Sequence, residues 1–99
     1  MIKIIVGYKV KNGKNIESIL LKLRSHAMTY PGFVGAENLI SEKDISIVAV
    51  VSTWTKAEDW ELWEKSMMRQ KLLQQAETLL VEEPKVTIYR TATTTRWVG

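Results

Sequence analysis

Apolar residues recur at every second position at the start of the chain, at Ile2, Ile4, Val6, Tyr8 and Val10. A period of two predicts a β-strand, because successive side chains of a strand point to opposite faces. The following Asn-Gly pair predicts a turn. Over residues 15–29 the apolar positions follow helical spacing instead, which predicts an amphipathic helix with one face to bury.

The rest of the chain continues this succession of patterns. Residues 34–41 and 45–54 predict two strands that form a hairpin across a polar turn. Helical spacing returns over residues 56–68, and again in a segment with Leu72, Leu73, Ala76, Leu79 and Leu80. A last strand is expected over residues 85–91. The order is β-α-β-β-α-β with an extra helical turn or two, which predicts a ferredoxin-like α+β fold, an antiparallel sheet with helices on one face.

The third predicted strand is apolar on both faces. Ile47, Ala49 and Val51 alternate with Val48 and Val50, so both faces of the sheet need cover at this strand. Helices cover only one face in such a fold. We therefore expect a partner on the other face.

Two local motifs flank the hairpin. Pro31-Gly32 predicts a type II turn, because proline fixes φ at the second position and glycine tolerates positive φ at the third. Thr55 and Glu58 predict a capping box that begins a helix at Lys56. Helical spacing then places Trp60, Trp63 and Met67 on one face, which we expect to point inward.

Composition narrows the classes of function. The 99 residues suffice for one domain, which we place over residues 1–99 with a C-terminal tail over 91–99. No cysteine is present and His26 is the one histidine, which excludes disulfides, thiolate zinc sites and a histidine metal cluster. The net charge of +3 is spread along the chain, and the basic N-terminal end lacks the interleaved aromatic residues of a nucleic-acid site. We identify neither a signal peptide nor an apolar run of about 20 residues, so we expect a cytoplasmic protein without a membrane segment.

Three motifs follow one another along the chain: Pro-Gly-Phe-Val-Gly over residues 31–35, a strand that ends in Trp54, and Trp60-Glu-Leu-Trp63 followed by Lys65-Ser66. Together they resemble the antibiotic biosynthesis monooxygenase-like proteins of the dimeric α+β barrel superfamily, over roughly residues 2–90. The resemblance implies a homodimeric α/β barrel that acts without metal, flavin or other cofactor on a compact aromatic or quinol-like substrate. Such proteins are thought to let the ionised substrate pass an electron to dioxygen, so the protein supplies an apolar pocket and a group that stabilises the anion.

Each helical candidate for the site has two interpretations. In the haem-degrading branch that the sequence resembles, a tryptophan at the place of Trp63 lines the pocket, and the alternative is a core indole. We assign Trp60 to the core. His26 is either a general base at the pocket mouth or a partly exposed histidine at a helix C-terminus. Met67 either fills a gap in the core or lines the pocket.

The candidates on strands also have two interpretations. Each either points a polar atom into a cavity or has a structural role on a face of the sheet or at the seam of the barrel; they are Tyr8, Asn38, Tyr89 and Arg90. We take His26 and Asn38 as the candidate catalytic residues. The candidate substrate-binding residues are Trp63, Met67, Phe33 and Tyr8. No metal ligand is predicted.

Two other classes of function compete with an oxygenase. The first is a dimeric barrel that binds a small apolar ligand or haem without turnover. The haem-degrading branch uses an asparagine and a histidine at places where this chain has Val6 and Leu73, and neither side chain ligates iron or donates a hydrogen bond. The second is an RNA-binding domain, which shares the element order but needs exposed aromatic residues on its central strands. The apolar third strand places that class last.

Overall fold

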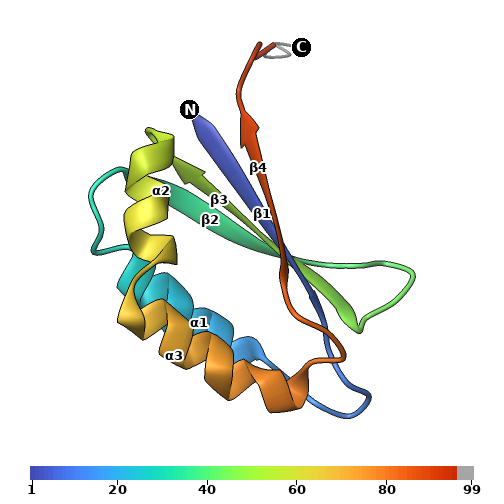
Figure 1. The fold of residues 1–99 in the computed structure, drawn as a ribbon. Coiled ribbons are helices and arrows are strands. Elements are labelled where there is room, and N and C mark those ends of the chain that lie inside the picture. Colours follow the sequence, from blue (N-terminus) through green and yellow to red (C-terminus); the bar gives the residue numbers. More distant parts are fainter. Residues whose placement is uncertain (96–99) are drawn as a thin grey trace.

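The computed structural model describes residues 1–95 and consists of an antiparallel sheet with helices packed against one face (Figure 1). The elements in chain order are β1 (Ile2–Lys9), α1 (Glu17–Ala27), β2 (Phe33–Ile40), β3 (Ile47–Trp54), α2 (Ala57–Glu64), α3 (Met67–Ala76), a short 3-10 helix η1 (Glu77–Leu79) and β4 (Lys85–Arg90). The four strands are ordered β2-β3-β1-β4. The ferredoxin-like α+β fold predicted from the sequence is confirmed.

The register of the strands determines which residues face the helices. Val6 on β1 lies opposite Val50 on β3 and Val86 on β4, and Asn38 on β2 also lies opposite Val50. Directly opposed residues of antiparallel strands share a face. The core forms between this face and the apolar stripes of the helices, with Ile4, Val6, Tyr8, Val48, Trp54, Ile19, Leu20, Leu72 and Ala76 among its buried members.

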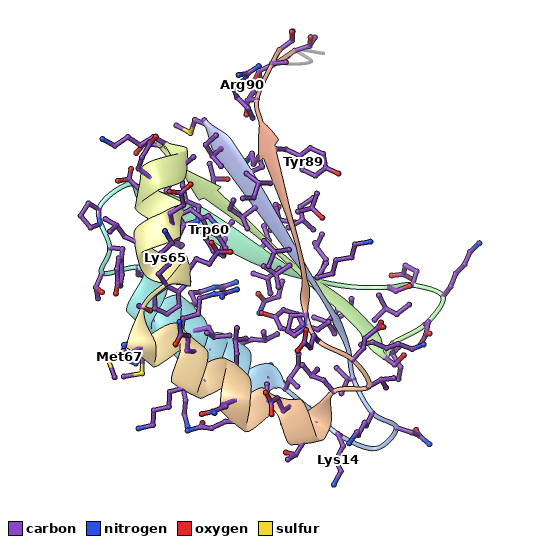
Figure 2. All side chains as sticks on the ribbon, in the orientation of Figure 1. Lys14, Trp60, Lys65, Met67, Tyr89 and Arg90 are labelled. Carbon is purple, nitrogen blue, oxygen red and sulfur yellow. The ribbon has the colours of Figure 1, made fainter. Side chains whose placement is uncertain are left out.

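The other face of the sheet carries no helix (Figure 1). The alternation predicted for the third strand is confirmed, because Val48 is buried under the helices while Ile47 is 44% exposed on the bare face. Leu39 and Tyr89 are also exposed there, and Figure 2 shows Tyr89 on the side of the sheet away from the helices. We call this surface the open face.

Strand β2 contains a β-bulge where it begins. Phe33 lies opposite Trp54 and Gly35 lies opposite Thr53, so Val34 is the extra residue without a partner on β3. Side chains alternate along a strand, and one additional residue reverses that alternation. The bulge therefore places Phe33 on the same face of the sheet as Asn38, toward the helices.

The predicted helix over residues 56–68 is wrong at its end, because two helices occupy this region. Helix α2 ends at Glu64, and Ser66 begins α3 by accepting a hydrogen bond from the Arg69 N–H at 3.1 Å. A helix N-cap of this kind stops the preceding pattern and starts a new one. Met67 is consequently the first residue of α3 and is 87% exposed rather than inward-facing. The expected extra turn or two is a helix of ten residues.

The predicted capping box is also wrong, whereas the predicted turn is confirmed. No side chain caps α2; the Thr55 hydroxyl instead donates to the Asp59 carboxylate at 2.8 Å. Gly32 has φ +84°, and a Cβ atom there would collide with Asp59. The Thr55 N–H donates to the Gly32 carbonyl at 2.8 Å. The turn before β2 is thus fixed against the start of α2 and requires glycine.

Among residues 1–95 no helix is long and apolar enough to cross a bilayer.

The C-terminal segment begins after β4, where the Thr91 N–H donates to the Met1 carbonyl at 2.9 Å. The remainder of the predicted 91–99 tail includes Arg96 and Trp97, which lie outside the described residues. The domain extent of 1–99 stays a prediction.

Candidate functional site

A small cavity lies between the sheet and the three helices, with a volume of about 50 Å³. Its sheet side is formed by alternating residues of the three strands β1, β2 and β3, among them Val6, Val50 and Ser52. Trp60 and Trp63 of α2 line it from the helix side. Residues of three strands and three helices therefore meet at one apolar space.

The aromatic wall of the cavity is a chain of edge-to-face contacts. Trp54 packs against Phe33 with ring centroids 5.3 Å apart and against Trp60 at 6.0 Å. Trp63 packs in the same manner on Tyr30 at 5.3 Å. Such pairs contribute roughly 0.5–1.5 kcal/mol each beyond the burial of area. The Trp54 indole donates to the Ser52 hydroxyl at 3.0 Å, so the wall is fixed in orientation as well as packed.

One polar pair lies at the β2 end of the cavity. The Arg24 guanidinium on α1 donates to the Asn38 amide oxygen at 2.9 Å, and both residues line the cavity. Because Oδ1 accepts this hydrogen bond, the Asn38 NH₂ group is the end left to donate to a ligand.

A second polar pair lies at the β1 end. Arg69 of α3 is only 8% exposed, and its guanidinium carbon lies 5.1 Å from the centroid of the Trp60 ring, a cation–π distance. Burial lowers the pKa of Arg69. The smaller electrostatic effects of Tyr8 and Glu64 act in the opposite direction and raise it. Burial raises the pKa of Tyr8 to about 12, and the charge of Arg69 opposes that shift. Tyr8 is therefore a neutral hydroxyl beside a buried cation at neutral pH.

The structure brings four of the six candidate site residues together and leaves two apart. Tyr8, Phe33, Asn38 and Trp63 all line the cavity. His26 is half-buried in the last turn of α1 and does not line it. Met67 projects from the start of α3 into solvent (Figure 2). The catalytic and binding roles of the four cavity residues stay predictions.

The two arginines of the cavity were not predicted. A charged side chain is rarely buried, so residue type alone does not point to Arg24 or Arg69. The helical spacing nevertheless contains the signal. Arg24 continues the stripe of Leu20 and Ala27, and Arg69 lies three and four residues before Leu72 and Leu73 in the stripe of α3. A cation on an apolar stripe indicates a polar group directed toward the core.

Metal and haem ligands can be tested against the same geometry. Within residues 1–95 no group of three or more His, Asp or Glu side chains is placed to hold a metal ion. Val6 lines the cavity and Leu73 lines an outer groove beside Arg69. Both are aliphatic at the positions where the haem-degrading branch has polar side chains, so these positions supply no ligand to iron.

Comparison with solved structures defines the class of fold. Several neighbours carry the name "putative antibiotic biosynthesis monooxygenase". The one from Deinococcus radiodurans superposes with a TM-score of 0.88 at 9% identity and covers 100% of both chains. The one from Nitrosomonas europaea has a TM-score of 0.82 at 17% identity, covering 94% of this chain and 100% of that one. The fold of antibiotic biosynthesis monooxygenase-like proteins, predicted from the three motifs, is thereby confirmed.

A third neighbour has a named activity. SnoaB from Streptomyces nogalater, a cofactor-independent oxygenase, superposes with a TM-score of 0.82 at 14% identity, covering 94% of each chain. No protein-family model matches the sequence, and no curated protein is significantly similar to it in sequence. At such low identities the likeness establishes the fold, and the function depends on the residues of the cavity.

Proposed function

We propose that the protein is a cytoplasmic, homodimeric and cofactor-independent monooxygenase that acts on a compact aromatic or quinol-like substrate. One observation carries the proposal: an apolar, aromatic-walled cavity with a few hydrogen-bonding side chains lies inside a fold shared with a cofactor-independent oxygenase. Apolar pockets with a small number of convergent polar groups are typical of small-molecule sites.

In the proposed reaction the substrate supplies the electrons, so the protein binds, orients and stabilises the substrate anion. A substrate anion passes one electron to dioxygen, and the two radicals combine to a peroxide at a carbon that bears a second hydrogen. Loss of water from the protonated peroxide leaves one oxygen atom as a carbonyl and releases the other in the water. Asn38 is proposed to stabilise the substrate anion through its NH₂ group, while Trp63 and Phe33 orient the ring. His26 has no part in this proposal, since it does not line the cavity.

The cavity must widen to admit a ring. Its volume of about 50 Å³ is well below the roughly 150 Å³ of a protein cavity that holds benzene. A groove of about 510 Å³ adjoins it and shares Leu20 and Asn38 with it. Separation of the Arg24–Asn38 hydrogen bond is the movement that we propose joins the two spaces, because this exposed pair lies where they meet.

The homodimer is proposed through the open face. Large apolar side chains are exposed toward both ends of this face. Leu39 and Ile47 lie near the loop between β2 and β3, and Tyr89 lies opposite Lys3 toward the other end of the sheet. Large apolar side chains exposed on a sheet face without helices indicate an interaction site, and a two-fold symmetric pairing would cover them on both copies at once.

Dioxygen consumption tests the proposed activity. The purified protein is screened with quinols and polyphenols in an oxygen electrode, with products identified by mass spectrometry. We expect at least one substrate to consume dioxygen in equal molar amount and to give a product heavier by one oxygen and lighter by two hydrogens. Asn38→Ala should slow turnover about tenfold or more, whereas Gln70→Ala on the exposed side of α3 should not. Uptake no greater than in protein-free controls across the whole panel would refute the oxygenase.

The alternative function, a barrel that binds haem or another apolar ligand without turnover, is favoured by the buried apolar lining and the absence of acidic residues from it. Because Val6 and Leu73 cannot hold iron, we expect haem to bind weakly. Spectral titration followed by reduction in air distinguishes the two functions. Conversion of bound haem to a biliverdin-like product would contradict this expectation.

A further inference from the structure

Arg69 is a nearly buried cation without a counter-ion. Its side chain is 8% exposed, and its contact with the Trp60 ring is through the π-face, at 5.1 Å. In the described part of the chain its guanidinium has no hydrogen-bond acceptor and no carboxylate within salt-bridge distance; Glu64 affects it only at longer range. Arg69 also lines the outer groove, whose acidic lining residues form no ion pair with it in the described part of the chain; they are Glu77, Glu82 and Glu83. Removing a charge from water without a partner is costly, so an anion in the cavity would stabilise this arrangement.

Two further donors lie around the same cavity. Trp60 lines it, and its indole N–H is fully buried with no acceptor among residues 1–95. Tyr8 also lines it as a neutral hydroxyl. Buried donors are paired in the great majority of proteins. A guanidinium fork, an indole N–H and a phenol O–H together call for an acceptor with several lone pairs.

The charge of the lining has one sign. Arg24 and Arg69 both line the cavity, and no aspartate or glutamate does so. Arg24 is occupied by Asn38 on β2, whereas Arg69 lies by Tyr8 on β1, with β3 between the two strands. Neighbouring strands are about 4.8 Å apart, so the strands of Asn38 and Tyr8, the residues beside the two cations, are roughly 10 Å apart. The unoccupied one, Arg69, is the place for an anion.

We propose that Arg69, Trp60 and Tyr8 form a carboxylate-binding subsite, so that the ligand of this cavity is an aromatic acid. A carboxylate has two oxygens with about four acceptor positions, and its geometry matches the guanidinium fork in a bidentate pair. A single phenolate oxygen would leave part of this donor set unpaired. The inference names the substrate class of the oxygenase site proposed above and shares that cavity with it.

Binding measurements under argon test the subsite separately from turnover. Benzoate, its neutral isostere benzamide and 4-nitrophenolate are titrated against the protein, with tryptophan fluorescence as the readout. We expect benzoate to bind at least tenfold more tightly than either of the other two. Arg69→Met, a change that fills the apolar site without the charge, should abolish this preference, and Arg69→Lys should restore part of it. Lys71→Met removes an exposed cation from the same helix, so it is the matched control and should retain the preference.

Each result decides the proposal. Equal binding of benzoate and benzamide, tighter binding of the phenolate, no binding of benzoate at millimolar concentration, or a preference that persists in Arg69→Met would overturn the subsite. Benzoate preference without any dioxygen uptake would leave the subsite and refute the oxygenase. Oxidation of neutral quinols at a rate unaffected by Arg69→Met would support the oxygenase and refute the carboxylate subsite.

Discussion

The two faces of the sheet place polar and apolar residues in opposite surroundings. On the covered face, Tyr8 and Ser52 are buried among aromatic and aliphatic side chains. On the open face, Leu39 is exposed, and Ile47 is exposed opposite Lys9 of the neighbouring strand, a charged and exposed residue. A polar residue buried among apolar side chains indicates function, and so does a large apolar residue exposed to solvent. The covered face therefore indicates a site, and the open face indicates a partner.

Removing one large aromatic residue from each face tests this difference most severely. Trp54 is 0% exposed and Tyr89 is 54% exposed. Trp54→Ala should lower the free energy of unfolding by about 3–5 kcal/mol through a cavity in the core. Tyr89→Ala should cost the folded subunit under about 1 kcal/mol, with a further loss that depends on protein concentration because it weakens the dimer. Urea unfolding at two concentrations measures both, and similar losses would mean that the faces do not differ.

Charge placed on the open face should break the proposed dimer. Ile47→Lys combined with Ala49→Lys puts two cations on an inner strand of this face, so we expect monomers or insoluble protein. Leu21→Lys is the matched control, since Leu21 is an exposed aliphatic residue on α1, away from the sheet. Sedimentation velocity gives the oligomeric state. A wild-type monomer at micromolar concentration would show that the open face has no partner copy.

Alkaline pH should destabilise the covered face through Tyr8. Its pKa is raised from 10.0 to about 12, so the folded state holds the proton more tightly than the unfolded state does. The stabilisation is complete below pH 10 and is lost as the pH rises toward 12. Two pKa units correspond to roughly 2–3 kcal/mol. Comparing the unfolding free energy at pH 9 and pH 12 should show a smaller fall in Tyr8→Phe than in the wild type, while Tyr89→Phe on the open face should behave as the wild type.

Trp63→Phe should have a small effect on stability for a change in the core. A smaller aromatic ring still fills most of the space under Tyr30, so we expect a loss of about 1 kcal/mol together with a several-fold loss of affinity for an aromatic ligand from the screen. Thermal unfolding and ligand titration are measured on the same preparation. A strongly destabilised variant that binds normally when folded would remove Trp63 from the site.

The fold could be predicted further than the site because the apolar periods identify elements directly. The alternation of β1 and β3 and the positive φ of Gly32 need no knowledge of the rest of the chain. The errors arose where two local signals competed. Methionines at 67 and 68 extend the apolar pattern of α2, yet Ser66 caps a new helix there. Thr55 had two carboxylates within reach, and packing against Gly32 selected Asp59 over Glu58.

The predicted site residues that line the cavity are aromatic residues or polar residues on strands. Aromatic residues and strand polar residues drew attention to Trp63, Phe33, Tyr8 and Asn38. Arg69 is buried because three helices and the sheet close around it, which is a tertiary property that no single segment contains. Only its position within the stripe of α3 anticipated this.

The bulge at Val34 has a consequence for how this chain can change in length. Insertion or deletion of one residue within β2 would exchange its two faces, turning either Phe33 or Asn38 out to the open face and an apolar or acidic neighbour inward. The polar loop between β2 and β3 has no such constraint, because residues 42–44 are exposed and add no side chain to the cavity. In a lineage of related chains, length variation should therefore accumulate in that loop, while β2 keeps the spacing from Phe33 to Asn38 unchanged.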